Sequence, residues 1–136
     1  MIKRALLVLL LAAGSAAAQD RTPAERQALS DLAYALGESH ALRQLCAGAG
    51  DQYWRDRMVR LTQVESADQA FDAVLRERFN TGFAAGQADA SACNAVSRRA
   101  EAAAASRGQA LARKLSVIMR RAAPPPQDEE PAAGEP

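Results

Sequence analysis

Four stretches of the chain carry apolar residues at the spacing of an α-helix, and no stretch alternates apolar and polar residues over the length of a strand. Alanine and arginine, which favour helices, are abundant, whereas valine, isoleucine and the aromatic residues are sparse. Residues 19–122, 104 in number, suffice for one small core. The sequence therefore predicts an all-α fold, a small bundle of about four helices over residues 19–122.

The first helix has the best specified start. Thr22 can cap it, Pro23 suits the first helical position, and Glu25 completes a capping box. Several leucines, His40 and Arg43 then share one face, while other apolar side chains fall on the opposite face. A helix with apolar residues all round is expected at the centre of the bundle.

The other three helices are predicted from caps and apolar stripes. Residues 47–51 end the first helix, and Asp51 is the expected cap of a second helix. The core stripe of this second helix is Trp54, Met58 and Leu61. A third helix is predicted to begin at Ser66, which fits a capping box with Gln69. Its stripe is Phe71, Leu75, Phe79 and Phe83. A fourth is predicted over residues 91–121 with Cys93, Val96, Ala100, Ala104, Leu111, Leu115 and Ile118 in phase.

Small residues predict where two helices approach closely. Gly82 and Gly86 stand one turn apart on the third helix, and residues 100–105 of the fourth are almost all alanine. We expect these two surfaces to face each other, with little apolar area buried between them.

The two ends of the chain differ from the predicted domain. Residues 1–18 combine a basic start, an apolar run of nine residues and a final alanine triplet, which is typical of a secretory signal peptide. We expect cleavage after about Ala18 and a periplasmic product, with an uncleaved anchor as the alternative. Residues 123–136 are proline-rich and acidic and are predicted to be disordered. They are either a solubilising end or a ligand for a proline-reading partner.

Export makes the two cysteines expected partners. Cys46 lies at the end of the first helix and Cys93 near the start of the fourth, and small exported domains usually pair such cysteines. This disulfide would close a loop of 48 residues, which stabilises the fold by about 4 kcal/mol in the chain-entropy account. A metal site built on His40, Cys46 and Cys93 is the alternative, but it lacks the four ligands of a structural zinc site. We expect no metal and no cofactor.

Several uncommon residues follow one another in a specific order. The segments are "LGESHALRQLC", "WRDRM" and "FNTGF", followed by a lone cysteine and a long helix with "GQALARKL". Over residues 29–115 this order resembles a family of small exported proteins of Gram-negative bacteria with no assigned function. The matching positions are Leu36, Gly37, His40, Leu42, Arg43, Leu45, Cys46, Trp54, Arg55, Asp56, Met58, Phe79, Asn80, Gly82, Phe83 and Cys93. The resemblance implies an exported, mostly helical domain with a disulfide and no known catalytic residues. The alanine-rich residues 100–105 depart from the family pattern.

Charge excludes one class of partner and leaves another open. After removal of residues 1–18 the chain has 15 basic and 16 acidic residues, so no global field attracts nucleic acid. Seven of the basic residues lie within residues 91–121, which hold one acid. A basic amphipathic helix of this kind either lies on an anionic membrane surface or is a solvated face that complements the helix dipole.

No residue pattern in the chain is typical of catalysis, so a non-enzyme is expected. One set of side chains is predicted to form either a buried polar network or a docking surface: His40, Arg43, Trp54, Arg55, Asp56 and Asn80. A pH-sensing role for His40 stays open. We predict an exported envelope protein that acts through contacts with a protein partner, as an adaptor, inhibitor or holdase-like helper. The alternative is a binder of anionic lipid or of a small envelope ligand, through the basic helix or a pocket between helices.

Overall fold

The computed structural model describes residues 20–122, and these form four helices. The helices are α1 (Pro23–Ala47), α2 (Tyr53–Glu65), α3 (Gln69–Asp89) and α4 (Ala95–Ala122). The predicted all-α bundle is confirmed. None of these helices is long and apolar enough to cross a membrane. The predicted signal peptide (1–18) and C-terminal tail (123–136) lie outside the described residues.

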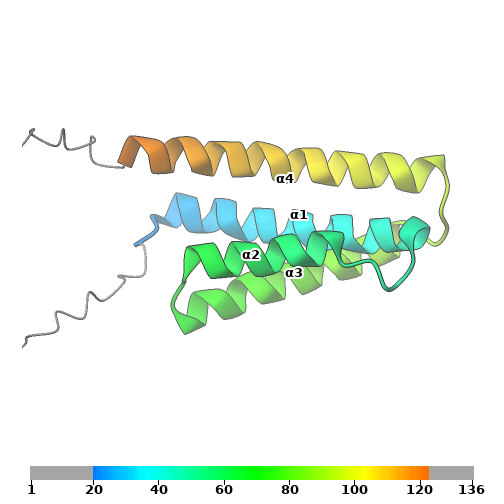
Figure 1. The fold of residues 1–136 in the computed structure, drawn as a ribbon, viewed down its shortest axis with the longest axis horizontal. Coiled ribbons are helices and arrows are strands. Elements are labelled where there is room, and N and C mark those ends of the chain that lie inside the picture. The colour runs from blue at the N-terminus through cyan, green and yellow to red at the C-terminus, as the bar shows by residue number, and fades with distance from the viewer. Residues whose placement is uncertain (1–19, 123–136) are drawn as a thin grey trace, which may run out of the picture.

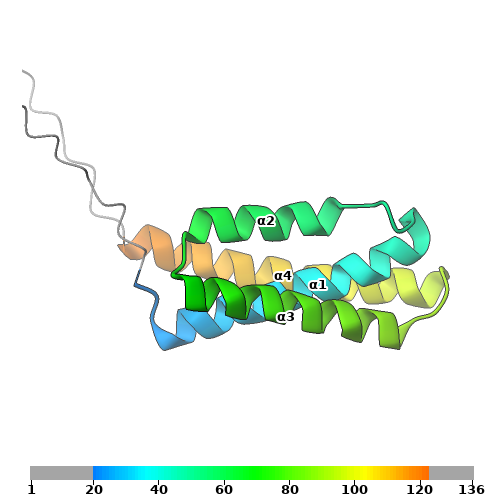
Figure 2. The same cartoon turned by 90° about the horizontal axis from the view of Figure 1, so that it is seen from below.

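Helix α1 is the centre of the molecule. Helices α4, α1 and α3 follow one another across the view in Figure 1, and the turned view in Figure 2 shows α2 on one face of them. Each of the other helices packs against α1, whereas the α4 backbone approaches neither α2 nor α3 closely. The core accordingly gathers around the α1 leucines. Its largest members are Leu29, Leu32, Leu36, Met58, Phe71, Leu75, Phe79 and Leu115.

The start of α1 has the predicted capping box and an additional ion pair. Thr22 Oγ1 accepts from the Glu25 N–H at 3.2 Å, and Glu25 Oε2 accepts from the Thr22 N–H at 2.7 Å. Just before this cap, Arg21 donates to both carboxylate oxygens of Glu65 at 2.9 and 2.8 Å. Burial lowers the pKa of Arg21, but the hydrogen bond and charge of Glu65 outweigh burial and raise that pKa. This buried pair holds the end of α2 against the start of α1.

The predicted start of α3 at Ser66 is wrong. Ser66 ends α2 in the left-handed conformation, with φ at 45°. The cap of α3 is Asp68, whose carboxylate accepts from the Phe71 N–H at 2.9 Å. At α2 the cap position is Gln52, which makes no side-chain cap bond. Asp51, the expected cap, lies one position before Gln52. Its carboxylate accepts a hydrogen bond from the Tyr53 N–H at 3.1 Å.

Helix α4 begins at Ala95, four residues after the predicted start. Asn94 Oδ1 accepts from the Ser97 N–H at 3.0 Å, and Ser97 Oγ accepts from the Asn94 N–H at 2.9 Å. Because this reciprocal cap turns Ser97 inward, Val96 is 63% exposed, and its predicted place in the core stripe is wrong. The buried stripe of α4 starts at Ser97 and continues through Ala104 and Leu115.

The glycines of α3 pack against α1, so the prediction that they face α4 is wrong. A Cβ atom built on Gly82 would lie 2.0 Å from the Tyr34 carbonyl oxygen, and one on Gly86 would lie 2.8 Å from that of Glu38. Gly37 of α1 is equally tight, with a Cβ position 1.9 Å from the Phe79 carbonyl oxygen. The backbones of α1 and α3 therefore touch, and only glycine fits at these points.

The predicted disulfide is present. The sulfur atoms of Cys46 and Cys93 are 2.09 Å apart and the Cα atoms 4.9 Å apart. The bond joins the last turn of α1 to the segment just before α4, so it closes the end of the molecule opposite the Arg21–Glu65 pair.

Candidate functional site

His40 is part of the packed core between α1 and α3. Its side chain is 4% exposed, and its ring centroid lies 5.8 Å from that of Phe79 and 5.5 Å from that of Phe83. Burial lowers the pKa of His40, and the positive charge of Arg55 lowers it further. A buried ring packed between two phenylalanines is a structural side chain, and the geometry gives it no direct route to a ligand.

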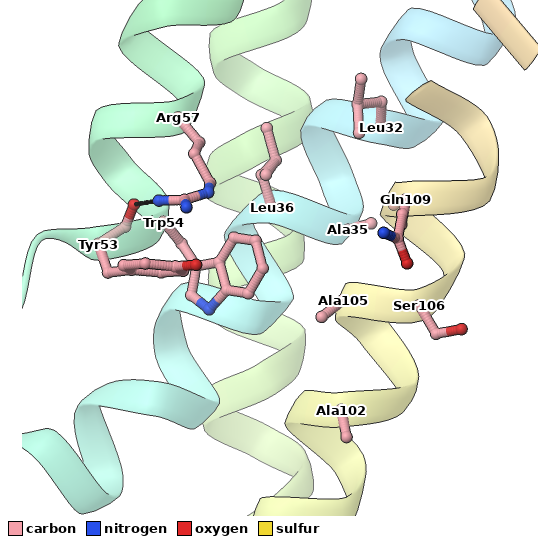
Figure 3. A pocket seen from close by; sticks show the side chains of 11 residues that line it. Leu32, Ala35, Leu36, Tyr53, Trp54, Arg57, Ala102, Ala105, Ser106 and Gln109 are labelled. Atoms are coloured by element: carbon pink, nitrogen blue, oxygen red, sulfur yellow. Dashed lines mark hydrogen bonds between the residues drawn. The ribbon is translucent and has the colours of Figure 1, made fainter. Parts of the chain in front are cut away.

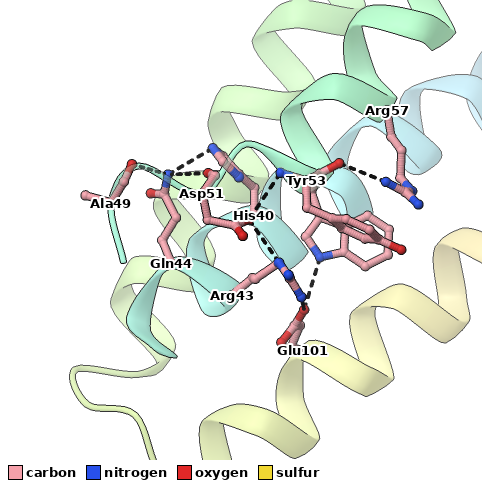
Figure 4. A network of polar contacts seen from close by, with 9 residues as sticks. His40, Arg43, Gln44, Ala49, Asp51, Tyr53, Arg57 and Glu101 are labelled. Carbon is pink, nitrogen blue, oxygen red and sulfur yellow. Dashed lines mark hydrogen bonds and ion pairs between the residues drawn. The ribbon is translucent and has the colours of Figure 1, made fainter. Parts of the chain in front are cut away.

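Arg43 lies one turn further along α1 and links this helix to the loop before α2 and to α4 through polar contacts. Its Nε donates to Asp51 Oδ1 at 2.9 Å, and its Nη1 is 3.8 Å from Glu101 Oε1 on α4. The same Glu101 oxygen accepts from Trp54 Nε1 of α2 at 3.1 Å. Figure 4 shows Arg43 between Asp51 and Glu101. The hydrogen bond from Arg43 keeps the pKa of Asp51 below its ordinary value.

Gln44 connects His40 with the loop that follows α1. Its Nε2 lies 3.3 Å from His40 Nε2 and donates to the carbonyl oxygens of Ala49 and Asp51 at 2.9 and 3.1 Å. The turn between α1 and α2 is thus held by a side chain of α1, which fixes where α2 begins.

The first residues of α2 form a stack of aromatic rings and guanidinium groups. The Tyr53 ring has the Arg57 guanidinium 3.5 Å from its centroid and the Arg43 guanidinium 4.6 Å from it. The Trp54 ring meets the Tyr53 ring edge-on, at 4.9 Å between centroids. Arg57 also donates to the Tyr53 carbonyl oxygen at 3.0 Å. These contacts hold both rings in place, although Tyr53 remains 42% exposed.

Next to this stack, an open groove of about 510 Å³ runs between α2 and α4. We call it the α2–α4 groove. Its floor is the face of α1 formed by Leu32, Ala35 and Leu36. One wall is Tyr53, Trp54 and Arg57 of α2, and the other is Ala102, Ala105, Ser106, Gly108 and Gln109 of α4. Figure 3 shows the two walls facing each other across the floor. The backbones of α2 and α4 do not approach each other closely, and most of the α4 residues that face this space are small. Because small side chains do not fill the space, a groove remains.

A second groove, of about 440 Å³, lies on the other side of α2, between α2 and α3. Asn80 and Arg55 line it together with Arg76, over a floor of Met58 and Phe79. Asp56 is exposed on α2. The six predicted site residues are therefore not brought together in one site. Arg43 and Trp54 meet at Glu101, and Trp54 lines the α2–α4 groove. His40 is in the core, Arg55 and Asn80 line the second groove, and Asp56 is on the surface.

The contacts of Glu101, Gln44 and Tyr53 were not foreseen from the sequence. A signal for the groove was nevertheless present, since two adjacent aromatic residues begin one helix and a run of alanines occupies another. Across residues 20–122, no three His, Cys, Asp or Glu side chains are grouped so that they could hold a metal ion.

The fold and site define a small helical protein braced by one disulfide, with an open groove on each side of α2. Residues 23–118 match the model of a family described as "Protein of unknown function (DUF2385)", and the chain belongs to this family. No curated protein matches the chain, and no solved structure does.

Proposed function

We propose that the protein is an exported, non-catalytic adaptor that acts through protein contacts and docks a partner in the α2–α4 groove. The observation that carries this proposal is the groove itself, where Tyr53, Trp54 and Arg57 stand over an apolar floor. Tryptophan, tyrosine and arginine are the residue types that contribute most to binding energy at protein interfaces. The packed position of His40 supports binding over catalysis, since the chain's one histidine has no access to a substrate.

The shape of the groove favours an extended segment of a protein partner. Its α4 wall is formed by Ala102, Ala105 and Ser106, whose small side chains allow a backbone to approach closely. Ser106 and Gln109 offer polar groups at that wall, and Arg57 offers a cation opposite. An apolar floor with a few polar groups along the sides is the usual composition of a specific binding site.

A photo-crosslinking experiment in the periplasm tests the proposal. A photoreactive residue replaces Ser106 in the groove or, as a matched control, the exposed Thr81 of α3. We expect a protein to be captured from position 106 and not from position 81. Ala105→Leu fills the groove and should abolish the capture, whereas Ala103→Leu adds the same bulk to an exposed position of α4 outside the groove and should not. The same capture from both positions, or its survival in Ala105→Leu, would contradict the proposal.

A second candidate function is attachment to an anionic membrane surface. It is supported by the outward side of α4, where Arg98, Arg99, Arg113 and Lys114 are all exposed. Such a cationic face gains about 1 kcal/mol for each basic residue near anionic lipid. Cosedimentation of the purified protein with vesicles tests this candidate. Binding to vesicles of phosphatidylglycerol and none to phosphatidylcholine supports it, and equal or absent binding rejects it.

A further inference from the structure

The groove has a candidate occupant within the same chain. Building on the proposed docking role of the α2–α4 groove, we infer that residues 123–136 occupy it until a protein partner takes their place. This C-terminal segment follows α4 directly and lies outside the described residues. Its length, its charge and its proline content each match the groove.

The C-terminal segment is long enough to fold back into the groove. Its 14 residues span about 43 Å as an extended proline-type helix. Gln109, at the near end of the groove, precedes Ala122 by 13 residues, or about 20 Å along α4. Ala102, at the far end, precedes it by 20 residues, or about 30 Å. Roughly 13 Å of chain then remains for the reversal of direction.

The direction of the helices also suits this path. Helix α4 ends beside the start of α1, where Arg21 and Glu65 hold the end of α2 (Figure 1). A chain that turns back from Ala122 therefore enters between α2 and α4 and runs antiparallel to α4 toward Tyr53 and Trp54.

Charges along the path are complementary to the segment. Arg60 follows Arg57 by one turn of α2, and Arg113 follows Gln109 by one turn of α4. All three arginines are exposed, and none of them forms an ion pair with a side chain of residues 20–122. The C-terminal segment has no basic residue and carries four acids: Asp128, Glu129, Glu130 and Glu135.

The proline residues suit the aromatic end of the groove. Proline-rich segments adopt an extended helix before they bind, so they lose little entropy when they dock against tyrosine and tryptophan rings. Glu135 is followed directly by Pro136. Because about 13 Å of the segment is used in the reversal, Asp128, Glu129 and Glu130 come near Arg113, whereas Glu135 reaches Arg57 and Pro136 lies close to Tyr53 and Trp54. A partner that carries acids next to proline would compete for the same contacts.

Cleavage by a protease specific for acidic residues tests the inference on the full mature chain. Cleavage after Asp128, Glu129 and Glu130 is followed by mass spectrometry, with the synthetic peptide 123–136 as the unprotected reference. The protease cuts the segment only while it is out of the groove, so the cleavage rate is proportional to the undocked fraction of the chains. A segment that is docked nine-tenths of the time is therefore cut about tenfold more slowly than the free peptide. We expect this protection in the wild-type chain, its loss in Ala105→Leu and in 1 M salt, and its retention in the control Ala103→Leu. Cleavage as fast as that of the peptide would overturn the inference.

Two further outcomes separate the possible occupants. Protection that rises with protein concentration would mean that the segment docks on a second copy, which contradicts occupancy within one chain. A photoreactive residue at position 106 of the purified chain should crosslink to residues 123–136, and one at position 81 should not. If position 106 captures a protein partner in cells while the segment is unprotected, this inference fails and the proposed function stands. If the segment is protected and no partner is captured, the proposed function fails and the occupancy of the groove by residues 123–136 stands.

Discussion

The indole Nε1 of Trp54 donates a hydrogen bond across the α2–α4 groove to Oε1 of Glu101, 3.1 Å away. Because the backbones of α2 and α4 do not approach each other closely, this side-chain bridge sets the width of one end of the groove. Arg43 supports the bridge from α1, since its Nη1 lies 3.8 Å from the same oxygen.

Glu101→Ala should loosen this end of the groove. The substitution removes the acceptor for the Trp54 indole and leaves Asp51 as the one carboxylate that contacts Arg43 among residues 20–122. We expect the free energy of unfolding in urea to fall by about 1 to 2 kcal/mol. Trp54 is the only tryptophan in the chain, so its fluorescence anisotropy should fall as well. Glu101→Gln keeps an oxygen acceptor for the indole, and its anisotropy should stay near the wild-type value. Equal anisotropy in Glu101→Ala and wild type would show that the bond does not hold the ring.

Gly37→Ala should destabilise the protein severely. The new methyl group would lie 1.9 Å from the Phe79 carbonyl oxygen, so α1 and α3 must separate. We expect a loss of about 3 kcal/mol or more, at the upper end of the cost of overpacking. Gly108→Ala is the matched control, because its Cβ would sit 3.6 Å from Ala35 and Leu32, an ordinary contact. That variant should gain up to about 1 kcal/mol from helix propensity. Chemical denaturation of both variants measures the difference in their free energies of unfolding. Similar values would refute the close backbone contact between α1 and α3 at Gly37.

Local signals in the sequence predicted helices well, and pairings between helices poorly. The cap at Thr22 was foreseen because its partner, Glu25, is three residues away. The start of α3 was misplaced because Ser66 and Asp68 both fit the cap pattern, and the left-handed backbone at Ser66 depends on the end of α2. The partner of Gly82 was also misassigned, since small residues indicate a close approach without naming the helix that approaches.

The candidate site was harder to predict than the fold. His40 was placed correctly on the core face, but whether that face met a ligand depended on Phe79 and Phe83, which lie far along the chain. The groove is defined by the space beside Ala102 and Ala105, and space between helices leaves no periodic pattern in a sequence. The cysteine pairing was predictable because the chain offered one pairing only.

Removal of the disulfide should lower stability without changing the fold. Cys46→Ala combined with Cys93→Ala opens the loop of 48 residues that the bond closes. We expect the free energy of unfolding to fall by about 4 kcal/mol by the loop-entropy relation. Circular dichroism should still show a helical protein at low temperature. Reductant should destabilise the wild type by a similar amount and leave the double variant unchanged. An unfolding free energy of the wild type that reductant leaves unchanged would contradict this contribution of the bond.

Mild acid should destabilise the protein through His40. Burial lowers the pKa of this ring below its ordinary value, and Arg55 adds to the shift, while Asp51 and Asp56 oppose it. The unfolded chain takes up a proton near pH 6.5, whereas the folded chain does so only at lower pH. The contribution of His40 is therefore complete above pH 6.5 and is lost as the pH falls toward the lower folded pKa, by at most about 1.4 kcal/mol per pH unit.

Denaturation at pH 7.5 and pH 5.5 measures this effect. His40→Leu removes the titrating group, so its stability should differ less between the two pH values than that of the wild type. The pKa values of Asp51 and Glu25 are lowered by their hydrogen bonds to Arg43 and to the Thr22 backbone, so these two carboxylates do not account for a loss of stability between the two pH values. A pH dependence that is identical in the variant and the wild type would assign the acid sensitivity to another group.

The contacts that hold the fold and the residues that wall the groove are largely separate. Gly37, Gly82 and Gly86 fix α1 against α3, whereas Ala102 and Ser106 face open space on α4. A substitution in the groove wall can therefore change the lining of the groove while the scaffold stays intact. In the proposed docking role, this separation would let binding preference diverge, by evolution or by protein engineering, at little cost to folding.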